Sequence, residues 1–209
     1  MGRVHADVTD LPGLLARAHA LVASGGRIIG IAGAPGAGKS TLAEQLVAAW
    51  GGTARLLPMD GFHLADEELV RLGRSDRKGA PDTFDFDGYV AALRRVREQR
   101  TDVLVPRFDR SLEAAIAGSL RISAGADLVV TEGNYLLLDE PGWRDVRPLL
   151  DEAWLLTTDH HERVDQLVAR HVANGRSDAE ARAWVSGVDE PNARRVAEHS
   201  FEPDMVVRR

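Results

Sequence analysis

The 209-residue chain has 44% apolar and 28% charged residues, which is typical of a globular protein and unlike a disordered or fibrous one. Its net charge of −6 argues against a general nucleic-acid-binding surface, and the absence of cysteine excludes disulfides, thiol catalysis and thiolate metal sites. No apolar run approaches the roughly 18–20 residues of a membrane span, and no secretory signal stands at the start, so we expect a cytoplasmic protein.

Predicted helices and strands follow one another along the chain. Residues 11–22 form a predicted amphipathic helix, which ends at the glycine pair 25–26. The isoleucine-rich run 27–32 is bounded by glycines and indicates a buried strand. Further along, we predict helices at 40–50, 89–98 and 162–173, and strands at 56–59, 103–105, 128–131, 153–157 and 205–207, the last at an edge or end of the sheet.

The order of these elements predicts the fold class. Apolar strands that alternate with helices indicate a parallel sheet covered by helices on both faces. We therefore predict an α/β protein with three α/β/α layers, a mostly parallel sheet of about five strands, and one domain over residues 1–209. In such sheets ligands bind beyond the carboxyl ends of the strands.

A glycine-rich segment lies between the strand at 27–32 and the helix at 40–50. Residues 33–40 read GAPGAGKS and match G-x-x-x-x-G-K-[ST] in the structural context that this motif requires. In such a loop, main-chain N–H groups hold phosphates, the lysine reaches the β- and γ-phosphates, and the hydroxyl ligates Mg²⁺. We predict a P-loop NTPase fold whose loop binds ATP through Gly33, Ala34, Pro35, Gly36, Ala37, Gly38, Lys39, Ser40 and Thr41.

Asp60 stands directly after the predicted strand 56–59, in the segment PMDGFHL. A carboxylate at the tip of this strand would face the γ-phosphate and accept a proton from a substrate hydroxyl. The alternative is an aspartate that only makes a turn before Gly61. The N-K-x-D signature of GTPases and the H-R-D and D-F-G signatures of protein kinases are absent, so these two classes are disfavoured.

Glu132 follows the apolar strand 128–131 and precedes Gly133. This is the expected position of the carboxylate that holds Mg²⁺ directly or through water. The alternative is an ordinary glutamate on a loop after a strand. We predict a Mg²⁺ site made by Ser40, Glu132 and Asp60.

Basic residues gather in the segment 160–176, at Arg163, Arg170, His171 and Arg176. Arg163 and Arg170 are seven positions apart and share one face of the predicted helix. A solvated charged face is the alternative. We predict a small helical lid within about residues 160–178 that closes over the nucleotide, excludes water and adds guanidinium charge.

Four blocks of the sequence resemble the P-loop kinases that include uridine kinase, phosphoribulokinase and the bacterial type of pantothenate kinase. They are GAPGAGKST at 33–41, MDGFH at 59–63, RKGAPDTFD at 77–85 and TEGNYLLL at 131–138, with weaker similarity in VPRFDR at 105–110 and ARHVANGR at 169–176. The resemblance covers nearly the whole chain from residue 27 on. It is greatest to a bacterial subgroup labelled fructose transport system kinase.

The resemblance implies roles for the matched residues. The implied catalytic residues are Lys39, Asp60, Glu132 and Arg170, with Asp60 as the base. ATP would also contact Arg170, Arg176 and Asn192, the last from a DEPN segment that borders adenine. The residues implied to hold the acceptor are His63, Lys78, Asp82, Asp85, Phe108, Asp109, Arg110 and Tyr135. The D-G-F-H and F-D-R-S-L-E segments depart from the uridine kinase pattern, and the D-G-F and K-G-x-P pieces are nearer to pantothenate kinase.

The motifs and the resemblance together predict an ATP- and Mg²⁺-dependent phosphotransferase. Its acceptor would be a hydroxyl of a small molecule such as a sugar, a nucleoside or a pantothenate-like acid. The alternative is a regulatory P-loop protein that binds or hydrolyses ATP without such an acceptor. Neither nucleic acid nor a membrane is an expected partner, and a homodimer is left open.

Overall fold

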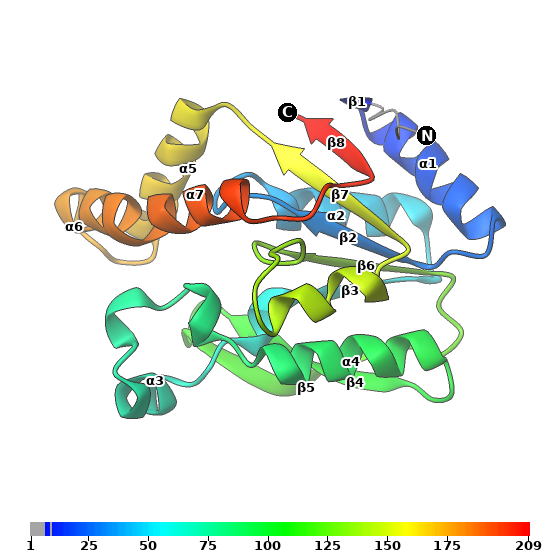
Figure 1. Ribbon diagram of the computed structural model, residues 1–209, viewed down its shortest axis with the longest axis horizontal. Helices are drawn as coiled ribbons and strands as arrows, with labels where there is room; N and C mark the ends of the chain where they lie inside the picture. The colour runs from blue at the N-terminus through cyan, green and yellow to red at the C-terminus, as the bar shows by residue number, and fades with distance from the viewer. Residues whose placement is uncertain (1–6, 9) are drawn as a thin grey trace.

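A parallel β-sheet forms the centre of the molecule, which the computed structural model describes at residues 7–8 and 10–209 (Figure 1). Its six strands are all parallel and lie in the order β1-β8-β7-β2-β6-β3. They are β1 (Asp7–Val8), β2 (Ile28–Ala32), β3 (Ala54–Pro58), β6 (Leu128–Gly133), β7 (Glu152–Thr157) and β8 (Met205–Arg208). The predicted α/β class and parallel sheet are confirmed; residues 1–6 and 9 of the predicted domain lie outside the described residues.

Strand β2 lies in the middle of the sheet, and all five of its residues are buried. It pairs with β6 on one side and β7 on the other, so that Ala32 is opposite both Gly133 and Leu155. The carboxyl ends of these three strands therefore meet at one edge of the sheet. The glycine-rich loop, Asn134 and Thr158 follow these strand ends and are brought to the same place.

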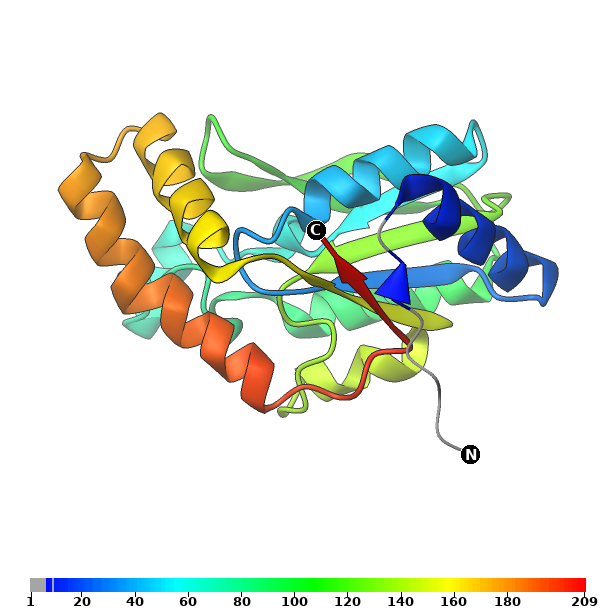
Figure 2. The same cartoon turned by 90° about the horizontal axis from the view of Figure 1, so that it is seen from above.

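Helices cover both faces of the sheet (Figure 2). Ile29 and Ile31 of β2 belong to one core, where α1 (Leu11–Ala23) and α2 (Lys39–Trp50) bury their apolar sides. Ile28 and Ala32 belong to the opposite core with residues of α4 (Phe86–Glu98), as expected from the period of two along a strand. The remaining helical segments near this face are α3 (Asp66–Leu72) and the 3₁₀ turns Ser75–Arg77, Pro81–Thr83, Trp143–Asp145 and Arg147–Leu149.

The strand predicted at 103–105 belongs to a separate hairpin and not to the parallel sheet. Strand β4 (Val103–Asp109) pairs antiparallel with β5 (Ala114–Ile122), a strand that has no counterpart among the predicted elements. Only residues 110–113 join the two strands, whereas parallel strands need a crossover of a dozen or so residues. The small residues of 114–119 lack the apolar alternation that indicates a strand.

The hairpin packs on the 3₁₀-helix η1 (Met59–Phe62), which carries Asp60. A Cβ atom on Gly61 would lie 2.3 Å from the carbonyl oxygen of Pro106 in β4. Gly61→Ala should therefore lower the free energy of unfolding by about 1–3 kcal/mol in urea denaturation, because one backbone must move. Gly52→Ala, a control glycine with open space around it, should stay within about 0.5 kcal/mol of the wild type. Equal losses in both variants would contradict this packing.

A helical arm, residues 160–198, extends from one end of the sheet (Figures 1 and 2). It contains α5 (His160–Ala173), α6 (Asp178–Trp184), a π-helical turn at Val185–Asp189 and α7 (Glu190–Glu198). Residues of α5, α6 and the π-helical turn form a small apolar cluster of their own. The predicted lid at 160–178 thus corresponds to the first helix of a longer arm. Among the helices that the structure describes, none combines the length and apolar character of a membrane span.

Candidate active site

The segment 33–38 forms a loop between the end of β2 and the start of α2. Gly36 and Gly38 have φ angles of +80° and +88°, a left-handed conformation that glycine adopts without strain. A Cβ atom on Gly36 would lie 2.6 Å from the Leu167 side chain and 3.0 Å from the carbonyl oxygen of Arg163. The loop is therefore packed directly against α5 of the arm.

Lys39 begins α2, and its amino group reaches back to the glycine-rich loop. Its Nζ donates to the carbonyl oxygen of Ala34 at 2.9 Å and to Oδ1 of Asn134 at 2.6 Å, and only 7% of the residue is exposed. Burial lowers the pKa of Lys39 to about 8, although the negative charges of Glu132 and Asp60 act in the opposite direction. A positive charge with so little hydration attracts an anion more strongly than it would in water.

Glu132 lies near the end of β6 and is 4% exposed. Its Oε1 accepts a hydrogen bond from Oγ of Ser40 at 3.2 Å. Burial, and after it the negative charge of Asp60, raise the pKa of Glu132 to about 7. A hydroxyl and a carboxylate side by side provide oxygen ligands of the kind that Mg²⁺ takes together with phosphate and water oxygens. Ser40 and Glu132 therefore fit the ion predicted here.

A cavity of about 290 Å³ adjoins the loop and brings several predicted residues together. Pro35, Gly36 and Lys39 line it from the loop, and Asp60 lines it from η1. The Asp60 side chain is 32% exposed, and its Oδ2 lies 3.6 Å from Nη2 of Arg110. Asp60 and Lys39 thus share one cavity at the carboxyl edge of the sheet.

The wall of the cavity opposite the loop is aromatic and basic. The ring of His63 lies 4.1 Å from that of Phe84 and 4.7 Å from that of Phe108, between centroids. Its Nδ1 is 2.8 Å from the carbonyl oxygen of Asp60, and burial lowers the pKa of His63. Lys78 places Nζ 5.7 Å from the centroid of the Phe108 ring and donates to Asp66 at 2.6 Å. This wall presents rings and a paired cation to the cavity.

The arm supplies the third wall of the cavity. Arg170 lines it, and its guanidinium makes no hydrogen bond or ion pair within residues 10–209. Burial lowers the pKa of Arg170, and the charge of Asp189 opposes that shift. Arg176 also lines the cavity, with its guanidinium carbon 3.8 Å from the centroid of the Trp184 ring. Both predicted lid arginines are therefore at the cavity.

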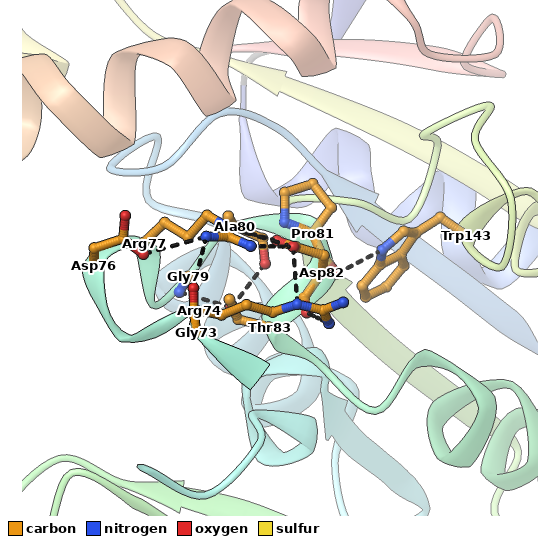
Figure 3. A network of polar contacts seen from close by, with 10 residues as sticks. All are labelled: Gly73, Arg74, Asp76, Arg77, Gly79, Ala80, Pro81, Asp82, Thr83 and Trp143. Carbon is orange, nitrogen blue, oxygen red and sulfur yellow. Dashed lines mark hydrogen bonds and ion pairs between the residues drawn. The ribbon is translucent and has the colours of Figure 1, made fainter. Parts of the chain in front are cut away.

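Three acidic residues predicted to hold the acceptor have other partners. Asp82 pairs with Arg77 at 3.0 Å and with Arg74 at 3.3 Å, in the polar network of Figure 3. The carboxylate of Asp85 accepts from the N–H of Gly88 and caps α4. The carboxylate of Asp109 accepts from Ser111 and Leu112 and closes the turn of the hairpin. None of the three is among the residues that line the cavity beside the loop.

Two further predicted residues also lie apart from this cavity. Tyr135 is fully buried, and its hydroxyl donates to the carbonyl oxygen of Gly79. Asn192 is 7% exposed and lines a separate hollow together with Arg77 and Asp82. In contrast, His63, Lys78, Phe108 and Arg110 all line the cavity beside the loop.

Some residues of the site were not among those predicted. Asn134 holds Lys39 and lines the cavity, and its signal in the sequence is a polar residue directly after the strand that ends at Glu132-Gly133. Asp189, which the sequence indicated only as part of the DEPN segment, lies 2.9 Å from Nε2 of His171 in the predicted lid, and both line the cavity. Trp184 lies within an ordinary helix, and no local pattern distinguishes it from a buried core residue.

The fold and the loop together define a P-loop nucleotide-binding protein. The model for the “Phosphoribulokinase / Uridine kinase family” matches residues 28–182, and the chain belongs to this family. The Schizosaccharomyces pombe protein “Putative uridine kinase C227.14” is 31% identical over 214 residues, which cover 96% of this chain and 91% of that protein. This agrees with the resemblance stated from the four sequence blocks.

Solved structures of similar proteins have the same architecture. The crystal structure of “putative fructose transport system kinase from Silicibacter sp. TM1040” is 35% identical, has a TM-score of 0.84, and matches over 95% of this chain and 99% of that chain. YFH7 from Saccharomyces cerevisiae has a TM-score of 0.87 over 96% of this chain and 99% of its own, at 18% identity. The second likeness concerns the fold alone.

Proposed function

We propose that the protein transfers the γ-phosphate of ATP to a hydroxyl group of a small molecule. The observation that carries this proposal is the single cavity shared by Lys39, at the phosphate loop, and Asp60, at the end of the neighbouring segment. A phosphate held at the loop and a hydroxyl beside Asp60 would then be in contact. Phosphoryl transfer of this kind depends mainly on such positioning and on electrostatic stabilisation.

The nucleotide side of the reaction would use the loop, Lys39 and the arm. Main-chain N–H groups of the loop and the N-terminus of α2 attract phosphate oxygens. The buried Lys39 and the unpaired Arg170 add positive charge where negative charge spreads during transfer. Mg²⁺ held by Ser40 and Glu132 would supply further charge to the phosphate oxygens.

The acceptor side would use Asp60. The acceptor oxygen forms a bond to the γ-phosphorus, the bond from that phosphorus to the bridging oxygen of ADP breaks, and the hydroxyl proton passes to an Asp60 oxygen. The 3₁₀ turn that carries Asp60 is held by the close approach of Gly61 to β4. We propose that arm residues 160–178 then act as a lid, since exclusion of water protects the phosphoryl group from hydrolysis.

The proposed acceptor lies against the wall formed by His63, Phe84, Phe108, Lys78 and Arg110. Rings suit the apolar face of a sugar or a base, and the basic groups suit a carboxylate or phosphate. The similar proteins are named as a uridine kinase and as a fructose transport system kinase, so their names do not agree on one acceptor. Sugars, nucleosides and pantothenate-like acids are therefore the proposed candidates.

An ATP-consumption screen with Mg²⁺ tests the proposal. Purified protein is incubated with sugars, phosphorylated sugars, nucleosides and pantothenate in turn, and ADP formation is followed together with the phosphorylated product. We expect ADP to form many-fold faster with one class of acceptor than with water alone. The contrary outcome is slow ATP hydrolysis that is unaffected by every acceptor and stimulated by a protein partner. That result would support a nucleotide-dependent regulatory protein.

A further inference from the structure

Two hydrogen bonds reach the phosphate loop from outside and bind its carbonyl groups. Nη1 of Arg163, in α5, donates to the carbonyl oxygen of Pro35 at 3.1 Å. The hydroxyl of Thr158, directly after β7, donates to the carbonyl oxygen of Ala37 at 3.1 Å. Neither donor is among the residues that line the active-site cavity; both line a second cavity, of about 300 Å³, together with Ala34 and Ala37 of the loop.

Because the peptide bond is planar, a hydrogen bond to a carbonyl group also fixes the direction of the N–H group in the same peptide. In a planar trans peptide the C=O and N–H groups point in opposite directions, and no cis peptide occurs in the described chain. The carbonyl of Pro35 shares its peptide plane with the N–H of Gly36, and the carbonyl of Ala37 shares its plane with the N–H of Gly38. Both N–H groups therefore point away from the outside donors, toward the concave side of the loop.

These two amide hydrogens are suited to an anion. Within the described residues, the N–H groups of Gly36 and Gly38 donate to no backbone acceptor. N–H groups on the concave side of a glycine-rich loop form an anion-binding nest. Glycine, however, allows the adjoining peptide planes to rotate at low energetic cost. The hydrogen bonds from Arg163 and Thr158 favour the orientation in which these N–H groups point to the concave side of the loop.

The donor on α5 is itself held firmly. Arg163 is 5% exposed, and its Nη2 pairs with Glu190 of α7 and lies 3.2 Å from Nδ1 of His160. Glu190 compensates the buried charge and leaves Nη1 directed at the loop. The guanidinium thus joins the loop to two helices of the arm, and its planar shape fixes the direction of each hydrogen bond.

We propose that Arg163 and Thr158 are positioning residues, which keep the N–H groups of Gly36 and Gly38 directed at a phosphate bound in the loop. This rests on the proposed function in one respect, the binding of phosphate at the loop. It adds two residues that lie outside the active-site cavity, and it assigns them the orientation of two peptide planes.

Thr158→Val gives the sharpest test, because it removes the hydroxyl and preserves the shape of the side chain. Binding of Mg²⁺-tripolyphosphate and MgATP is measured by titration calorimetry, without acceptor. We expect about tenfold weaker binding for Thr158→Val, the effect of one lost hydrogen bond, and about wild-type binding for Thr158→Ser. The matched control is Thr157→Val, which removes a hydroxyl bound to the Val207 carbonyl at 3.2 Å and should leave binding unchanged.

Amide NMR distinguishes a positioning role from a purely structural one, because it reports the two N–H groups separately. In the wild type, tripolyphosphate should shift the amide proton signals of Gly36 and Gly38 downfield. In Thr158→Val the shift of the Gly38 amide should be reduced while that of Gly36 is retained. In Arg163→Lys the shift of the Gly36 amide should be reduced while that of Gly38 is retained. Arg147→Met, which breaks a pair with Asp204 at 2.7 Å, is the control for loss of a partly buried arginine.

The outcomes separate this inference from the proposed function. Wild-type binding in Thr158→Val and unchanged Gly38 shifts would overturn the positioning role, whatever the enzyme phosphorylates. A wild type that binds MgATP but transfers phosphate to no acceptor would remove the kinase proposal and leave the binding test valid. A wild type that binds neither ligand would remove both.

Discussion

Asp60→Asn should lower kcat about 10²–10⁴-fold, the usual effect of losing a general base, with little change in affinity for ATP. Asparagine has the same shape and can keep the place of Asp60 beside Arg110, but it cannot take up the acceptor's proton. The free energy of unfolding should change little, because the lost repulsion from Glu132 offsets the lost attraction to Lys39 and Arg110. Steady-state kinetics with the acceptor found in the screen, together with calorimetry of ATP binding, measure both quantities.

A surface carboxylate gives the matched control for this variant. Asp139 pairs with Arg144 at 3.3 Å and is 48% exposed, outside the active-site cavity. Asp139→Asn should retain wild-type turnover within about twofold, as expected of an exposed ion pair. Near-normal turnover in Asp60→Asn would exclude Asp60 as the base, and a Tm loss that accompanies the kinetic loss would assign the effect to folding.

Lys39→Met should weaken ATP binding and reduce kcat about 10²–10³-fold, comparable to the loss of one preorganised donor at a developing negative charge. Methionine fills a similar volume without the ammonium, so the loop keeps its packing. The charge of Glu132 then loses the partner that lowers its pKa, and the pKa of Glu132 should rise further. Mg²⁺ binding should therefore weaken along with ATP binding, which calorimetry at several Mg²⁺ concentrations measures.

The other lysine of the chain provides a contrast on the acceptor side. Lys78 lies on the wall with Phe108 and bonds Asp66 and the carbonyl oxygen of Glu113. Lys78→Met should raise KM for the acceptor and leave ATP affinity unchanged. Unchanged ATP affinity and turnover in Lys39→Met would count against the assignment of the phosphate loop, since no other lysine reaches it.

Much of the fold follows from short apolar runs and the glycines around them. The run at 27–32 predicts β2 almost to the residue, and the helices at 11–22 and 40–50 also agree with α1 and α2 within a residue. The hairpin could not be predicted, because its pairing depends on a tight turn and on contacts with η1. Most residues of 114–119 in β5 are small and exposed or half-buried, so this part of the strand carries little hydrophobic pattern.

The site follows from sequence where its residues lie at or just beyond the carboxyl ends of strands: Glu132 lies within the end of β6, and Asp60 lies in η1, which follows β3. The loop, Asp60 and Glu132 are brought together because the carboxyl ends of parallel strands meet at one edge. Residues assigned by resemblance alone divide between the cavity, as for Phe108, and structural contacts, as for Tyr135. The contact of Arg163 with the loop depends on how α5 lies in space, which no local pattern specifies.

The side of the cavity at the glycine-rich loop and the wall that carries Phe108 come from different parts of the chain. The nucleotide wall comes from the carboxyl edge of the parallel sheet, whereas Phe108 and Arg110 come from an antiparallel hairpin that is paired only with itself. Its base packs into the core beneath the sheet through Val103, Val105 and Ile122, whereas Phe108 and Arg110, at and beside its tip, share no strand pairing with the sheet. On the proposed function, substitutions at the tip of this hairpin should change which acceptor is used, while the loop that would hold the triphosphate stays the same.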